Sequence, residues 1–177
     1  PDDRKRTLAL DIAEQLDSHA LEPWIGDLLN DPCADVRRRA LKCCMRMDNI
    51  CNYQQSIIVC CSDEEPEVRA AALNLWPILN LDREQLYQAL NDPDSLVVAH
   101  AITAICSLEQ PPDYPKVMVA VQRCLDEGET SAATMCQAIS EAGLEEFSPR
   151  LVTMLYSSPR LRTAACEALG KLQNRNC

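Results

Sequence analysis

The sequence contains very little glycine and few aromatic residues. Only four glycines and one phenylalanine occur among 177 residues, and aromatic residues make up 4% of the chain. So few glycines leave little room for β-hairpins, dinucleotide-binding turns or phosphate-cradling loops. The chain also has eleven prolines and 47% apolar residues, a composition that suits helices separated by sharp stops. Composition therefore favours an all-α protein.

An excess of positive charge and long apolar runs are missing as well. The formal net charge of −10 argues against a general binder of nucleic acid or of anionic membranes, because phosphate groups demand a basic surface. No apolar run approaches the roughly 18–20 residues that cross a membrane, so we expect no membrane insertion. No signal-peptide pattern opens the chain. The sequence starts inside an expected helix at residues 4–16, and we expect a fragment of a longer protein.

Cysteines are numerous, but they form no recognisable framework. There are eleven, an odd number, with two adjacent pairs and no Cys-x-x-Cys motif. This pattern does not resemble a secreted disulfide scaffold, and a free cysteine packs well in a helical core. We expect reduced cysteines and a cytoplasmic location. The alternative is zinc bound by residues among Cys43, Cys44, Cys51, Cys60 and Cys61, but zinc ligands usually come in pairs two to four residues apart, and we predict no metal site.

Motifs that carry enzyme chemistry are also missing. The chain has only two histidines, His19 and His100, and neither has a visible base partner or orienting group. No nucleophile elbow, phosphate loop or dinucleotide-binding motif occurs. We therefore predict that the protein is not an enzyme, has no catalytic residues and binds no cofactor. Both histidines are expected at the surface.

The feature that recurs along the chain is a turn followed by an amphipathic helix. The letters Leu-Asn-Asp-Pro occur at 29–32 and again at 90–93, and related turns occur at 62–66 and 157–159. The first apolar residues of the helices that follow are Val36, Val68, Val97 and Leu161. They are separated by about 30 residues, with one double step, and a period of this length built from helix pairs indicates a solenoid.

Each repeat is expected to contain two helices. The first helices are placed at about 21–30, at 53–61, after 82, after 115 and at 146–156. The second helices are placed at about 35–47, 68–79, 97–108, 131–144 and 161–172, preceded by an orphaned second helix at 4–16. We predict a single domain over 1–177, with units at roughly 1–20 (partial), 21–50, 51–80, 81–110, 111–144 and 145–177.

The helical period also predicts which side chains face inward. Leu73, Ile105 and Val152 are among the positions expected in the core. The three prolines at 111, 112 and 115 predict an extended connection at 109–116.

The pattern Asp-Pro-x-x-x-Val-Arg-x-x-Ala-Leu resembles the HEAT repeat, and its short period resembles the phycobilisome-lyase-type subgroup. The segment 161–172, LRTAACEALGKL, is the copy most similar to that pattern. The resemblance implies a right-handed α-solenoid of about five helix pairs, an armadillo-like superhelix. It further implies that the arginine after the anchor bridges neighbouring turns, a role that carries over to Arg37, Arg69 and Arg162. The sequence departs from this pattern in the third and fourth units, where Val98 and Ala132 occupy the position of that arginine. The motif is specific for fold and says little about activity.

Two sets of residues are candidates for contacts with a partner. Eight of the seventeen positive charges lie in the first 50 residues, and Arg38, Arg39, Lys42 and Arg46 share one helical stripe. In HEAT arrays the second helix lines the concave face. On the same face, later units carry small or weakly polar residues: Ala70, Ala71, Asn74, Ala99, His100, Thr103, Gln137, Thr163 and Glu167.

We predict a non-catalytic scaffold that binds a protein or peptide partner along the concave face. The partner-binding residues proposed for it are Arg38, Arg39, Lys42, Arg46, Asn74, His100 and Thr103. A solvated charge stripe with no partner, or a phosphate-bearing ligand, are other interpretations of the basic residues. The alternative functions are a bilin-lyase-type enzyme or enzyme subunit, and nucleic-acid binding through the basic N-terminal end. A small-molecule ligand is not expected.

Overall fold

The computed structural model describes residues 3–16, 18–79, 81–109 and 111–175. Within these ranges the secondary structure consists of helices and turns, and no strand is found there. The predicted all-α class is confirmed. None of the helices in these ranges is long and apolar enough to cross a membrane. The chain divides into two compact units, Pro1–Leu81 and Asp82–Cys177.

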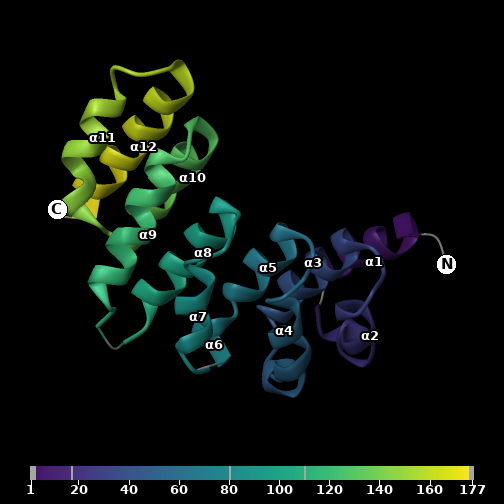
Figure 1. Ribbon diagram of the computed structural model, residues 1–177. Coiled ribbons are helices and arrows are strands. Elements are labelled where there is room, and N and C mark those ends of the chain that lie inside the picture. Colours follow the sequence, from purple (N-terminus) through teal and green to yellow (C-terminus); the bar gives the residue numbers. More distant parts are fainter. Residues whose placement is uncertain (1–2, 17, 80, 110, 176–177) are drawn as a thin grey trace. The chain divides into compact units, whose positions relative to one another are not determined.

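The first unit contains helices that contact one another in two rows (Figure 1). Helix α3 packs between α1 and α5 in one row, while α2 contacts α4 in the other. Each pair of consecutive helices also packs together, α2 on α3 and α4 on α5. The elements are α1 (Asp3–Leu16), η1 (Ser18–Trp24), α2 (Ile25–Leu29), α3 (Ala34–Cys44), η2 (Ile50–Tyr53), α4 (Gln54–Cys60), α5 (Pro66–Leu73) and α6 (Trp76–Leu79).

The second unit repeats this pairing of helices. Helix α10 packs between α8 and α12, and the preceding helices pack on them, α7 on α8, α9 on α10 and α11 on α12 (Figure 1). The elements are α7 (Glu84–Ala89), α8 (Ser95–Ser107), α9 (Tyr114–Asp126), α10 (Glu129–Ala142), η3 (Glu145–Phe147), α11 (Ser148–Met154) and α12 (Pro159–Arg175).

The same turn precedes α3, α5 and α8. In each copy an aspartate side chain accepts a hydrogen bond from the backbone N–H two residues further on, which is the geometry of an Asx turn. The three bonds are Asp31 to Cys33 at 2.8 Å, Asp63 to Glu65 at 3.0 Å and Asp92 to Asp94 at 2.9 Å. The valine that follows each turn is buried: Val36, Val68 and Val97 are at most 1% exposed. The repeated turn therefore starts each helix in the same register.

The expected second helix at 68–79 is broken in two. Helix α5 ends at Leu73, and α6 begins at Trp76. Pro77 explains the break, because a proline ring clashes with the carbonyl four residues earlier, and here that carbonyl belongs to Leu73. The prediction of one continuous helix was wrong at this point, although Leu73 and Trp76 are both buried as expected.

Two further expectations need correction. Pro115 does not belong to the extended connection, because it lies in the first turn of α9, where a proline costs no hydrogen bond. Val152 of α11 was expected in the core, but its side chain is 45% exposed. Leu151 and Met154 are buried instead. The helix is only seven residues long, so two buried positions cover its inner face.

Arg37 joins two successive turns of the first unit. Its guanidinium donates to both carboxylate oxygens of Asp63, at 2.7 and 2.8 Å, and to the backbone carbonyl of Asp31 at 2.7 Å. The side chains of Arg37 and Asp63 are 16% and 10% exposed. Arg6 of α1 makes the equivalent contact one repeat earlier, with its guanidinium 2.6 and 3.0 Å from the carboxylate of Asp31. Arg6 was not among the predicted structural arginines.

The other predicted arginines hold their own turns. Arg69 donates to the carbonyls of Asp63 and Glu64 at 2.8 and 3.0 Å, and Arg162 donates to the carbonyl of Ser157 at 3.4 Å.

Where Val98 replaces the expected arginine, the preceding turn is bound from a different helix. Arg123 of α9 donates to the carbonyls of Leu90 and Asp92 at 2.9 and 3.3 Å. A cation therefore still binds this turn, but it comes from the next helix pair.

Replacing Ile105 by aspartate tests the core of the second unit. Ile105 is 0% exposed, and burying an unpaired carboxyl group there should lower the free energy of unfolding by at least about 3 kcal/mol. The measurement is urea denaturation followed by circular dichroism. Val119, which is 70% exposed, is the control: Val119→Asp should change stability by less than about 0.5 kcal/mol. An Ile105→Asp protein with the wild-type unfolding midpoint would contradict the assigned core.

Replacing Asp63 by asparagine tests the turn-to-turn ion pair. Burial by itself raises the pKa of Asp63, but the Arg37 guanidinium and the N–H of Glu65 outweigh it and hold the pKa below the ordinary aspartate value. The charged form therefore stabilises the fold above about pH 4, and this contribution is lost as the pH falls through the lowered folded-state pKa. We expect Asp63→Asn to cost about 2 kcal/mol at neutral pH.

The cost of Asp63→Asn should shrink as the pH falls below about 4 and through the lowered folded-state pKa of Asp63, where the wild-type carboxylate becomes protonated as well. The matched control is Asp126→Asn, because the Asp126–Arg150 pair is 53% and 46% exposed and should contribute less than about 1 kcal/mol. Equal costs for the two variants, or a cost of Asp63→Asn that does not change with pH, would show that the Arg37–Asp63 pair stabilises the fold no more than an exposed ion pair does.

Candidate partner-binding surfaces

Three residues of the predicted basic stripe, Arg38, Arg39 and Lys42, lie on α3, whereas Arg46 follows the end of that helix at Cys44. Arg38 and Arg39 form ion pairs within the first unit. Arg38 pairs with Asp35 at 2.5 Å, and Arg39 pairs with Asp35 at 2.8 Å and also with Asp11 of α1. Lys42 and Arg46 are exposed. An anionic ligand would have to compete with these two aspartates for the arginines. The stripe is therefore less positive than its sequence alone indicates.

Asn74 is the other predicted contact residue of the first unit. It follows α5 directly, and its side chain is half-buried. Two other residues of the predicted small-residue set offer a partner little surface, because Ala70 in the first unit and Ala99 in the second are only 2% and 7% exposed.

The second unit has a groove on the face made by α8, α10 and α12. It consists of two hollows, of about 50 Å³ between α8 and α10 and about 540 Å³ between α10 and α12, and both are lined by Gln137. We call this the second-helix groove. Its polar lining residues are His100, Thr103, Thr134, Gln137, Ser140, Glu141, Arg160, Thr163, Glu167 and Lys171.

The sequence predicted five of these ten polar residues and missed the other five. His100, Thr103, Gln137, Thr163 and Glu167 were expected on this face as one set, of which His100 and Thr103 were named as binding residues. Arg160 and Lys171, at the two ends of the groove on α12, were overlooked. The signal that would have found them is their helical phase, since both lie on the same side of α12 as Thr163 and Glu167.

The groove offers neutral hydrogen-bonding groups more than charge. Thr103 donates its hydroxyl to the carbonyl of Ala99 at 2.9 Å, and Ser140 donates to that of Gln137 at 2.8 Å. The exposed amide of Gln137 donates to Glu141 at 2.8 Å. These alcohols and amides, set among alanines, can accept the backbone of a peptide or a small helix without a steric clash.

His100 lies in this groove and is half-buried rather than fully at the surface. Burial lowers its pKa below the ordinary histidine value, and the nearby Glu141 carboxylate opposes this shift. The imidazole is therefore neutral at physiological pH. The side chain of His19 lies outside the described residues.

The cysteines that the structure describes are thiols in no disulfide bond. Burial raises the pKa of Cys44 and Cys61 to about 12 and that of Cys60 and Cys136 to about 11. Thiols with such pKa values remain protonated, and a protonated thiol is a poor nucleophile and a poor metal ligand. Within the described ranges no group of three or more His, Cys, Asp or Glu side chains is placed to hold a metal ion.

Compared with protein families and with curated proteins, the chain matches no family model and no curated sequence. The resemblance to HEAT repeats therefore depends on the repeated turn and helix pattern of the chain itself.

The lowered pKa of His100 predicts a pH-dependent stability. A histidine that binds its proton less readily in the folded state destabilises the fold as the pH drops below the unfolded-state pKa of about 6.5. We expect the free energy of unfolding of the wild type to fall between about pH 7.5 and pH 5.5, and His100→Gln to show a smaller fall. Parallel pH profiles for the two proteins would contradict this, as would an NMR titration giving His100 a pKa above that of an unstructured histidine.

Proposed function

We propose that this chain is a HEAT-like α-solenoid module that binds a protein partner along the face formed by its second helices. The support for the solenoid is the order of packing inside each unit. Helix α3 lies between α1 and α5, and α10 lies between α8 and α12, as neighbouring repeats of a solenoid require. The repeated Asx turns and buried valines at the same register agree with this arrangement.

The observation that carries the binding proposal is the second-helix groove. A surface that runs across three consecutive second helices and is lined by alanine, threonine and glutamine has the shape and chemistry of a site for a peptide or helix. Its larger hollow, about 540 Å³, can hold several side chains of a partner.

The basic stripe on α3 is a second contact region in this proposal. Arg38 and Arg39 are paired with aspartates. This favours a protein partner over nucleic acid, because binding to the phosphates of a nucleic acid requires cations whose charge is not already neutralised. The first 81 residues contain nine Lys and Arg residues against fourteen Asp and Glu residues, which would also repel a polyanion.

Filling the groove should abolish partner binding. Thr163 is exposed and lines the larger hollow, so the side chain of a Thr163→Arg variant would occupy it. The matched control is Thr153→Arg on α11, which makes the same change at an exposed threonine outside the groove. We expect quantitative affinity capture from the native host to recover a partner with the wild type and with Thr153→Arg, and at least about tenfold less of it with Thr163→Arg.

Charge reversal of Arg38, Lys42 and Arg46 tests the stripe in the same experiment. If the partner contacts both the second-helix groove and the basic stripe, affinity capture with this variant should also fail to recover it. Recovery of every captured protein in equal amounts by the wild type and by Thr163→Arg would overturn the groove as the binding surface.

A further inference from the structure

A separate hollow lies on the first helices of the second unit, away from the groove on α8, α10 and α12. It measures about 310 Å³ and is lined by residues of α7, of the turn after it and of α9. We call it the first-helix cleft. Leu90 and Ala120, each 4% exposed, provide apolar surface in its wall. Val119 also lines it and leaves 70% of its side chain exposed.

Two cations lie on the α9 side of this cleft. Lys116 is 60% exposed, and its ammonium nitrogen lies 5.0 Å from the centroid of the Tyr87 ring and 3.3 Å from the Asp113 carboxylate. Arg123 is held by its bonds to the Leu90 and Asp92 carbonyls, and its Nε lies 3.2 Å from Glu127. The two cations are seven residues apart, which is about 10 Å along a helix.

The combination of apolar surface with flanking cations defines the chemistry of an occupant. An exposed valine beside an apolar wall favours a ligand that covers it with a hydrocarbon side chain. The existing ion pairs to Asp113 and Glu127 are at least one-third exposed on both sides, and such pairs contribute less than about 1 kcal/mol each. An incoming carboxylate can therefore replace either aspartate or glutamate at little cost.

We propose that the first-helix cleft binds an acidic segment of a protein partner. An apolar anchor side chain of that segment packs against Leu90, Ala120 and Val119, and its carboxylates, about two helical turns apart, contact Lys116 and Arg123. The site is independent of the second-helix groove, because it is built from different helices. Charge complementarity selects the ligand, because Lys116 and Arg123 line the cleft, whereas their partners Asp113 and Glu127 do not.

The probe is a phage-displayed library of random peptides, selected on the immobilised full chain. We expect the enriched sequences to share one large apolar residue with Asp or Glu on both sides. The affinity of a labelled enriched peptide, measured by fluorescence anisotropy, should fall at least about tenfold in Lys116→Glu and several-fold in Val119→Ser. It should also weaken as sodium chloride is raised, because the cations are exposed.

Matched controls separate this site from the groove. Lys171→Glu makes the same charge reversal at an exposed lysine of the second-helix groove and should leave the affinity unchanged, as should Thr163→Arg. Circular dichroism melting establishes that each variant is folded. Enriched peptides without an acidic bias, no enrichment over the bare matrix, or unchanged affinity in folded Lys116→Glu would each overturn the proposal. A further outcome would also overturn it: if decanoate binds more tightly than any selected peptide, and Lys116→Glu abolishes this binding, the ligand is a free fatty acid and not a protein partner.

Discussion

Several helices of this protein are too short to be stable without their neighbours. Helix α2 has five residues, α4 seven and α7 six, whereas an isolated helix needs roughly 12–15 residues to be even marginally stable in water. Each must therefore bury its apolar face against the next element. In the first unit one continuous core results, which extends from Leu10 of α1 through α3 to residues of α5 and α6.

The turns between these helices depend on aspartates that make two kinds of bond. Asp31 and Asp63 each accept a hydrogen bond within their own turn and an ion pair from an arginine of the preceding repeat. One side chain thus sets where a helix starts and links that helix to its neighbour. Because Asp31 is only 8% exposed, both bonds are shielded from water and contribute more than surface pairs do.

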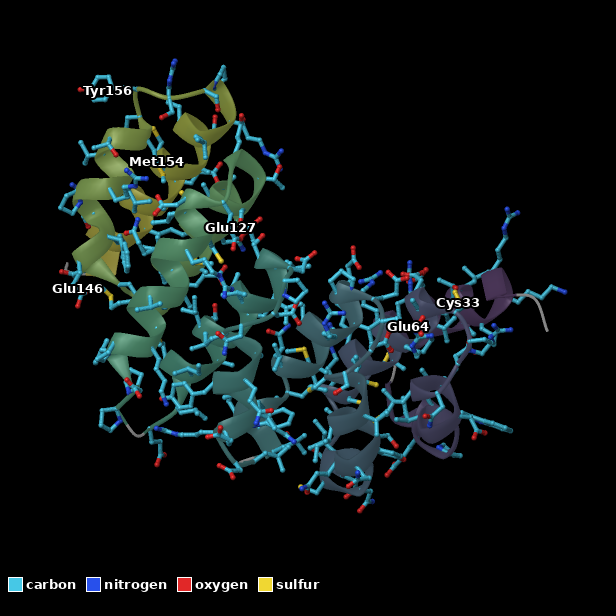
Figure 2. All side chains as sticks on the ribbon, in the orientation of Figure 1. Cys33, Glu64, Glu127, Glu146, Met154 and Tyr156 are labelled. Carbon is cyan, nitrogen blue, oxygen red and sulfur yellow. The ribbon has the colours of Figure 1, made fainter. Side chains whose placement is uncertain are left out.

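The surfaces left over by this packing differ between the two helix layers. The second helices of the second unit present small and polar side chains along the groove, while α7 and α9 present apolar surface and cations. Tyr156, in the turn after α11, is 87% exposed and projects away from the ribbon (Figure 2). Val119 of α9 and Tyr156 are therefore apolar or aromatic side chains that the packing leaves at the surface.

Local rules were enough to derive much of the fold from the amino-acid sequence. The helical period identified buried positions such as Leu73 and Ile105, and the Asp-Pro turns gave the helix starts, because both signals depend on residues close together in the chain. The break at Pro77 was also a local signal, but it was overlooked.

Tertiary structure decided which side chains from distant segments meet. The contacts of Arg123 with the Leu90 turn, the pairing of Arg39 with Asp11, the exposure of Val152 and the first-helix cleft all join residues far apart in sequence or depend on how short helices pack. Periodicity shows which face of a helix is apolar. The neighbour that covers this face, and the hollow left beside it, follow from packing in three dimensions.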